Sequence, residues 1–229
     1  MNLLLVEDEI KIAEFVVRGL SSAGFQVEHV EDGLAAQNAL SAQTYDLVVM
    51  DVMLPKLDGF EVLKSLRKAG DATPVIILSA KSDLSDRLHG FEIGADDYLP
   101  KPFFVEELVA RIKVLNKRRN AEDPALEIVV DQLSLDVVNR KAHWHDVTAV
   151  LSQREFTLLE YLMRSPGQIF TRKQILQHVW DIHFDPQTNV VDVCIQRIKR
   201  KLMRKDHAHD SPIESVRGVG YRLRTESSS

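Results

Sequence analysis

Reactive side chains in the first half of this 229-residue chain follow directly after short apolar runs. Continuous apolar runs of four or five residues are typical of strands that are buried on both faces of a sheet. In a parallel sheet all strands end at one edge, so the residues that follow them meet in space. The residues concerned are Glu7, Asp8, Asp51, Ser79 and Lys101.

Three carboxylates, a hydroxyl and an ammonium group would then share one site. Carboxylates in a partly desolvated cleft repel one another, so either one of them takes up a proton or a cation lies between them. Oxygen ligands without Cys or His suit Mg²⁺. Asp51 could act as a carboxylate nucleophile toward phosphorus, with Lys101 and Ser79 as partners of the phosphoryl oxygens. A structural ion-pair network is the alternative, and the joint placement at four strand ends favours the phosphoryl site.

Four stretches of residues 1–117 resemble the receiver domain of bacterial two-component response regulators. They are VEDE (6–9), VVMDVMLPKLDG (48–59), LSA (78–80) and GADDYLPKPF (94–103). The resemblance implies that Asp51 accepts a phosphoryl group from a phosphohistidine of a sensor histidine kinase. It implies Mg²⁺ held by Asp8, Asp51, the backbone carbonyl of Met53 and, through water, Glu7. Ser79 and Tyr98 match the switch residues of the family.

The expected fold of this half is α/β, a five-stranded doubly wound parallel sheet of the flavodoxin-like receiver type. The strands are expected at 2–6, 26–30, 46–51, 74–78 and 97–99, and the helices at 10–22, 34–43, 59–68, 84–93 and 104–118. We therefore assign residues 1–118 to a receiver domain. The polar stretch that ends at Pro124 gives a linker over residues 119–125.

Charge is distributed unevenly along the chain. Residues 1–117 carry 19 acids and 12 bases, whereas residues 126–229 carry 13 acids and 15 bases, which indicates two domains with different partners. No apolar stretch approaches the ~18 residues of a membrane helix, and the first residues lack the basic start of a signal peptide. The single cysteine, Cys194, excludes an intrachain disulfide and favours the cytoplasm.

Residues 126–225 are expected to form an α+β domain. Four short strands come first, at 126–130, 133–138, 141–145 and 147–150, and a hairpin at 213–223 comes last. Between them we expect helices at 153–165, 172–179 and 189–204. Ser152 and Glu155 form a capping-box pattern before the first helix, and Thr171 and Thr188 are candidate caps of the other two.

The third of these helices has one apolar face and one basic face. Its apolar residues recur at spacings of four, three and four: Val191, Ile195, Ile198 and Leu202. Six bases lie between residues 197 and 205. Such a helix can enter the DNA major groove, although it could equally bind an acidic membrane surface or be an ordinary solvated helix. The preceding helix–turn–helix layout and the hairpin that follows favour DNA.

Residues 126–225 resemble the winged-helix DNA-binding domain of the OmpR/PhoB class of response regulators. The matching stretches are LSQREFTLLEYL (151–162), FTRKQILQHVW (170–180), TNVVDVCIQRIKRKL (188–202) and RGVGYRL (217–223). By position, Val193 and Arg197 match residues that reach base edges. Arg217 matches a residue of the minor groove. The remaining matches are to phosphate or sugar contacts: Thr171, Gln196, Lys199 and Arg200. The family has a base-facing His where Cys194 lies, so we expect Cys194 to pack or to make a weak contact, and not to sense redox state.

The combined resemblance implies a phosphorylation-activated, DNA-binding transcription regulator that forms a homodimer when phosphorylated. It implies no enzyme activity beyond the receiver's own phosphorylation and dephosphorylation. The charges that match the family's dimer contacts are Arg87, Glu92, Asp96, Asp97, Glu107, Arg111 and Arg118. Ser79 is expected to move toward the phosphoryl group and Tyr98 to rotate into the vacated space. The loop 180–188 is a candidate surface for RNA polymerase, and its sequence resembles the heavy-metal-responsive branch of the family.

Two other functions compete with this one. A phosphatase could pass through an aspartyl-phosphate, but such an enzyme would carry an acid where Met53 stands. A regulator that no longer depends on phosphate would not need the complete set of acids with Ser79 and Lys101. A transition-metal site is disfavoured, because the spacing of the candidate histidines matches no zinc signature. These are His178, His183, His207 and His209.

Overall fold

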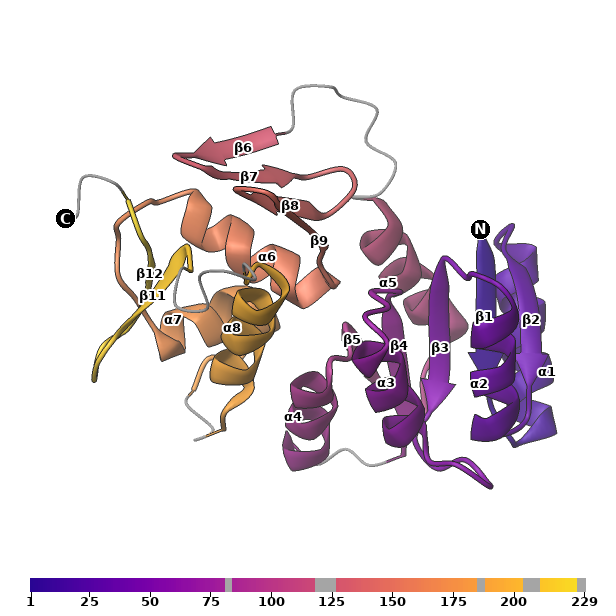
Figure 1. The fold of residues 1–229 in the computed structure, drawn as a ribbon. Coiled ribbons are helices and arrows are strands. Elements are labelled where there is room, and N and C mark those ends of the chain that lie inside the picture. Colours follow the sequence, from indigo (N-terminus) through magenta and orange to yellow (C-terminus); the bar gives the residue numbers. More distant parts are fainter. Residues whose placement is uncertain (81–83, 118–126, 185–187, 204–210, 226–229) are drawn as a thin grey trace. The chain divides into compact units, whose positions relative to one another are not determined.

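The computed structural model describes residues 1–80, 84–117, 127–184, 188–203 and 211–225. The chain forms two compact units, Met1–Lys117 and Arg118–Ser229 (Figure 1). The expected receiver domain ended one residue later, at 118, and the expected linker 119–125 lies outside the described residues.

The first unit contains a five-stranded, wholly parallel sheet with the order β2-β1-β3-β4-β5. Its strands are β1 (Asn2–Val6), β2 (Gln26–Val30), β3 (Leu47–Asp51), β4 (Val75–Ser79) and β5 (Asp97–Pro100). The order reverses between β1 and β3, which is the point where ligands bind in doubly wound sheets. The expected fold class is confirmed, and each strand lies within one residue of its expected bounds.

Five helices cover the two faces of this sheet (Figure 1). They are α1 (Ile10–Ser22), α2 (Gly33–Ala42), α3 (Gly59–Lys68), α4 (Leu84–Ile93) and α5 (Val105–Lys117). α1 and α5 contact each other, as do α2 with α3 and α3 with α4. Alternate strand residues such as Leu5 and Val49 pack in one cluster with Val16 of α1 and Ile112 of α5. Because the remaining alternates of β1, β3 and β4 are buried too, these three strands have continuous apolar sequences, whereas the edge strand β2 is only partly buried.

The second unit begins with an antiparallel four-stranded sheet in chain order. Its strands are β6 (Glu127–Val130), β7 (Leu133–Asp136), β8 (Lys141–Trp144) and β9 (Val147–Val150). Three helices follow: α6 (Gln153–Met163), α7 (Arg172–Trp180) and α8 (Val190–Lys201). A hairpin of β11 (Ile213–Val216) and β12 (Gly220–Leu223) completes the unit. The two-residue strand β10 (Phe170–Thr171) pairs with β12 and was not expected, because two residues carry no alternation pattern.

Local capping explains where these helices begin. The capping box of Ser152 and Glu155 is confirmed, with the Ser152 N–H donating to Glu155 Oε2 at 2.9 Å. The capping role of Thr171 is confirmed as well. The prediction that Thr188 caps the third helix was wrong, because Asn189 is the residue before α8. Thr and Asn both cap helices, so two neighbours of these types cannot be ranked by pattern.

Candidate functional site

The acidic residues that follow β1 and β3 lie together at the carboxyl edge of the parallel sheet. Glu7, Asp8 and Asp51 each offer a carboxylate oxygen within 4.8 Å of the others. β1 and β3 are hydrogen-bonded neighbours, so residues 44 positions apart in the chain become adjacent at the point where the strand order reverses. The structure therefore brings together the three acids that the sequence singled out.

Lys101 joins this group from the end of β5. Its Nζ donates to Glu7 Oε2 at 2.7 Å, to Glu7 Oε1 at 3.0 Å and to Asp51 Oδ2 at 2.5 Å. Burial alone would lower the pKa of Lys101, but its hydrogen bonds to Asp51 and Glu7 and their charges outweigh burial and raise that pKa. Lys101 is therefore a protonated ammonium group held directly against the Asp51 carboxylate.

The two acids that precede α1 have different surroundings. Glu7 is buried, and burial raises its pKa although the hydrogen bond from Lys101 opposes this change. Asp8 is exposed. A set of three carboxylates, without thiolate or imidazole in the group, is the donor chemistry of a hard divalent cation such as Mg²⁺. Among the described residues this is the one group of acids, His and Cys that could hold a metal ion.

The loop after β3 is fixed against Asp51. The Met53 N–H donates to Asp51 Oδ1 at 3.0 Å, and the Gly59 N–H donates to the Val52 carbonyl at 3.0 Å. A Cβ at Gly59 would lie 2.2 Å from the Asp51 carbonyl oxygen, so this close approach requires glycine. The loop therefore holds the Met53 backbone next to the acidic group, while the Met53 side chain is exposed.

Ser79 and Tyr98 lie inside the first unit, at the end of β4 and within β5. Ser79 is fully buried, Tyr98 is 2% exposed, and the two side chains are hydrogen-bonded to each other. Burial raises the pKa of Tyr98, although the hydrogen bond to Ser79 opposes the change. We expected Tyr98 to rotate inward on activation. Its ring is already buried here, so the structure offers no outward starting position for that rotation.

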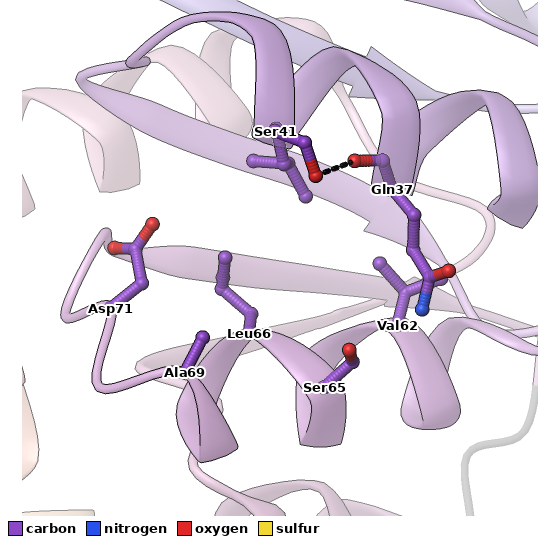
Figure 2. Close-up of a pocket in the computed structure, with 8 residues that line it drawn as sticks. Gln37, Ser41, Val62, Ser65, Leu66, Ala69 and Asp71 are labelled. Atoms are coloured by element: carbon purple, nitrogen blue, oxygen red, sulfur yellow. Dashed lines mark hydrogen bonds between the residues drawn. The ribbon is translucent and has the colours of Figure 1, made fainter.

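A hollow of about 310 Å³ lies between α2 and α3, as Figure 2 shows. Its lining comes from the second half of α2 and from α3 with the following loop: Gln37, Leu40, Ser41, Val62, Ser65, Leu66, Ala69 and Asp71. Both helices run from the carboxyl edge of the sheet toward its amino edge, so the hollow lies away from Asp51. None of the predicted site residues lines it.

Most of the charges predicted to pair across a dimer lie on α4, β5 and α5. Arg111 donates to Asp97 and Glu107 of its own chain, each at 2.8 Å. Glu92 is half-buried, the Nε of Arg87 is buried without a hydrogen-bond partner among the described residues, and Arg118 lies outside them.

Asp96 differs from the other predicted dimer charges because it is buried. Its Oδ2 accepts from Arg67 Nη2 and from the Val75 N–H, both at 2.9 Å. Arg67 also donates to the carbonyls of Asp71, Thr73 and Gly94. Assigning Asp96 to a dimer surface was therefore wrong for this structure. The sequence shows Asp96 only as one of two neighbouring acids. Its ion-pair partner Arg67 lies 29 residues earlier, so the pairing could not be predicted from the local pattern.

The predicted nucleic-acid residues of the second unit lie on α8, at the start of α7 and on the hairpin. The apolar face of α8 is buried as expected, with Val191, Ile195, Ile198 and Leu202 each inaccessible to solvent. The exposed predicted residues are Thr171, Gln196, Arg200 and Arg217, and the half-buried ones are Val193, Arg197 and Lys199. Burial lowers the pKa of Lys199, whose Nζ lies 3.4 Å from Ser215 Oγ.

Part of the basic run at the end of α8 has a structural role. Lys201 Nζ donates to Glu155 Oε2 at 2.7 Å and to the Val150 carbonyl at 2.9 Å. Cys194 is buried, and burial raises the pKa of its thiol. Lys201 therefore fastens α8 to the start of α6, and Cys194 belongs to the packed interior, as expected.

Two of the four histidines for which a metal site was disfavoured have other neighbours in the structure. His178 stacks on Tyr161 with ring centroids 3.9 Å apart, and His183 lies 3.1 Å from Asp181. His207 and His209 lie outside the described residues.

An acidic site at the switch point of a doubly wound sheet, followed by a helical unit with a basic helix and a hairpin, defines the class of response regulators. The family model "Response regulator receiver domain" matches residues 3–113, and "Transcriptional regulatory protein, C terminal" matches residues 146–223. The chain belongs to the OmpR/PhoB family of response regulators.

Individual relatives match nearly the whole chain. The transcriptional activator protein IrlR of Burkholderia pseudomallei (strain 1026b) is 43% identical over 230 residues, which cover 100% of this chain and 98% of IrlR. The transcriptional regulatory protein CusR of Escherichia coli (strain K12) is 39% identical, with 97% of each chain covered. A solved structure of a RitR variant has a TM-score of 0.66 and 31% identity, covering 98% of this chain and 99% of RitR.

The two matched domains describe what the chain does in outline. It is a response regulator that combines a receiver with a DNA-binding, transcription-regulating domain. These domains indicate a histidine kinase and DNA as partners. Among the described residues, none of the helices combines the length and the apolar character that crossing a membrane needs.

Proposed function

We propose that Asp51 accepts a phosphoryl group from a phosphohistidine of the partner kinase, and that this modification activates DNA binding. The observation that carries the proposal is the position of Lys101, whose Nζ lies 2.5 Å from Asp51 Oδ2 beside two further acids. A structural ion pair needs one acid for one base. Among the described residues, Lys101 bonds to both Glu7 and Asp51, and Asp8 adds a third carboxylate beside them, which leaves negative charge for a cation to balance.

The residues of the site have separable roles in this transfer. An Asp51 carboxylate oxygen forms the new bond to phosphorus while the bond to the histidine nitrogen breaks. The Lys101 ammonium stays within reach of the Asp51 oxygens and balances the phosphoryl charge. Mg²⁺ would supply further neutralising charge, and Asp8, Asp51, the Met53 carbonyl and, through water, Glu7 would hold it. The fixed loop after β3 favours that set, because it holds the Met53 backbone against Asp51.

The hydrogen bond between Ser79 and Tyr98 offers a route from the phosphoryl group to the surface. A hydroxyl that donates to the phosphoryl oxygens must reorganise its bond to Tyr98, and Tyr98 lies on β5 beside Asp97. We propose that this change favours a homodimer through α4, β5 and α5. The charges that would pair across it are Arg87, Glu92, Asp97, Glu107, Arg111 and Arg118; Asp96 is left out because Arg67 already holds it.

The second unit would place α8 in a major groove of promoter DNA. Val193 and Arg197 would reach base edges, and Arg217 would enter the neighbouring minor groove. Phosphate and sugar contacts would come from Thr171, Gln196, Lys199 and Arg200. A dimer would place two such helices on adjacent half-sites, which makes the second contact intramolecular and raises avidity. We further propose that the loop 180–188 meets RNA polymerase, in the cytoplasm where promoter and polymerase lie.

The alternative functions have less support. A phosphatase would need a further acid or base beside Asp51, and the residue two positions on is the exposed Met53. The signal of the proposed pathway enters at the kinase. If the resemblance of residues 180–185 to the heavy-metal-responsive branch holds, the kinase would sense the metal.

The proposal is tested by selecting duplexes from a random-sequence DNA pool with the full chain, with and without acetyl phosphate and Mg²⁺. The unaltered chain should retain a specific set of duplexes far better with the phosphodonor, whereas Asp51→Asn should show no such gain. Glu14→Gln, an exposed carboxylate of α1, is the matched control and should behave like the unaltered chain. An equal gain with Asp51→Asn would reject Asp51 as the acceptor.

A further inference from the structure

In the second unit, the Asp192 side chain on α8 is bonded to side chains from two other elements, α7 and β12. Asp192 lies in the first turn of α8, and one of its carboxylate oxygens accepts from Arg172 Nη1 at the start of α7. The other oxygen accepts from the Tyr221 hydroxyl on β12. Arg172 also donates through Nη2 to the Thr188 carbonyl, just before α8, at 2.5 Å. Asp192 is thus shared between α7, α8 and the hairpin.

These three elements are the ones that carry the proposed DNA contacts. Thr171 precedes Arg172 directly, Val193 follows Asp192, and Arg217 lies in the turn of the hairpin that contains Tyr221. The DNA contacts made by different elements can form together only if the elements keep a fixed mutual position.

The backbone fixes one side of this arrangement. β12 pairs with β10, the strand that ends at Thr171, with Phe170 opposite Tyr221 and Thr171 opposite Gly220. A Cβ at Gly220 would lie 2.0 Å from the Phe170 carbonyl oxygen, so the pairing depends on glycine. The hairpin is therefore joined to the start of α7 through the backbone, and the Asp192 side chain extends that connection to α8.

A role in stability alone does not account for this arrangement. The Arg172 and Asp192 side chains are about one-third exposed, at 34% and 30%, and ion pairs with such exposure contribute little to folding. An acid in the first turn would favour α8 without any partner. Neither effect needs the Tyr221 hydroxyl, whose bond to Asp192 crosses from the hairpin to α8.

We propose that Asp192 is a positioning residue for DNA binding: with Arg172 and Tyr221 it holds the hairpin and the start of α7 against α8. Arg217 and Arg197 can then reach neighbouring grooves at the same time. The inference rests on the proposed DNA contacts of Arg197 and Arg217. It adds Asp192 to the residues needed for DNA binding, as one that contacts other parts of the protein and not the DNA.

The test is a double-mutant cycle on a duplex selected by the unaltered, phosphodonor-treated full chain. Tyr221→Phe removes only the hydroxyl and should lower affinity by roughly tenfold, about the loss that Arg217→Ala causes. In the Arg217→Ala background Tyr221→Phe should add less than about twofold, because the contact that it positions is already gone. The preference at positions read by Arg197 should persist in Tyr221→Phe.

Tyr161→Phe is the matched control, since it removes a phenolic oxygen from α6 of the same unit and leaves the bonds of Asp192 intact. Asp192→Ala provides a second cycle: it removes the acceptor of the Tyr221 hydroxyl, so adding Tyr221→Phe should cost nothing more. Equal losses from Tyr221→Phe with and without Arg217 would overturn the inference, because they would mean a direct phosphate contact or a general loss of folded protein. If the unaltered chain selected no duplex at all, the proposed DNA binding would fail, and the inference with it.

Discussion

The two proposed sites of this chain are built in opposite ways. In the first unit the functional charges are gathered and partly buried, with Glu7 at 1% and Asp51 at 6% exposure, both bonded to Lys101. In the second unit the candidate contacts are spread along α8, the start of α7 and the hairpin, and several are exposed. The first site suits chemistry on a small group, because low exposure strengthens charge interactions. The second suits a large, charged partner, because its groups face outward.

The difference also separates two uses of the same residue types. Lys101 and Arg67 are both held against acids, but Lys101 faces a group with excess negative charge whereas Arg67 satisfies one buried aspartate. On α8, Lys201 is fastened to Glu155 while Arg200 is exposed. Charge type alone therefore does not reveal function, and the balance of partners around each charge does.

The largest expected effect is the loss of phosphorylation on removing the acceptor. Asp51→Asn should abolish phosphoryl incorporation from acetyl phosphate with Mg²⁺, because an amide oxygen is not a competent nucleophile. Intact-protein mass spectrometry measures the incorporation. The control Glu14→Gln should gain one phosphoryl group at the rate of the unaltered chain. If Asp51→Asn gained it at that rate too, Asp51 would not be the acceptor.

The contrast between buried and exposed charge can be measured as stability. Arg67→Met should lower the free energy of unfolding by about 3–5 kcal/mol, because it leaves the Asp96 carboxylate buried without its ion-pair partner. Lys64→Met breaks an exposed pair with Glu61 and should cost about 0–1 kcal/mol. Urea denaturation of both variants provides the comparison. Similar costs for the two would contradict the structural role of Arg67.

The DNA face should separate residues that read bases from residues that bind phosphate. Arg197→Ala should cost about 1–3 kcal/mol on the selected duplex and relax the preference at one position. Arg200→Ala should weaken binding to all duplexes alike and lower the salt dependence of the affinity. Binding titrations at several salt concentrations distinguish the two. A uniform loss from Arg197→Ala would assign that residue to the backbone.

The smallest effect is expected at Cys194, which has no place in either site. Burial raises the pKa of its thiol, so the thiol stays protonated and shielded at neutral pH. A thiol-reactive disulfide reagent should modify Cys194 in the denatured chain and leave the native chain, and its DNA binding, unchanged. Rapid modification of the native chain would show that α8 opens or packs differently.

In the first unit the sequence was sufficient to predict the fold and the grouping of the acids with Lys101, because residues that follow parallel strands lie at the same edge of the sheet. Apolar runs that end in Glu7, Asp51 and Lys101 imply a common edge once the sheet is parallel, and the structure has that edge. The sequence does not show which charged side chains already form ion pairs within the folded chain. Asp96 resembled a surface acid because its partner Arg67 lies on a different element, α3.

In the second unit the sequence revealed the elements and the apolar face of α8, but not the connections between them. Strand β10 is two residues long, and the bonds of Asp192 to Arg172 and Tyr221 span 20 and 29 residues. No periodic pattern predicts a bond between single side chains at such separations. These connections depend on tertiary packing, which only the folded chain defines.

One measurement tests the role of Asp51 most directly. The full chain, treated with acetyl phosphate and Mg²⁺, is reduced with borohydride, which converts an aspartyl-phosphate into homoserine, and is then mapped by peptide mass spectrometry. We expect homoserine at position 51 and unmodified Glu7 and Asp8. Homoserine at another acid, or a phosphate that borohydride cannot remove, would contradict it.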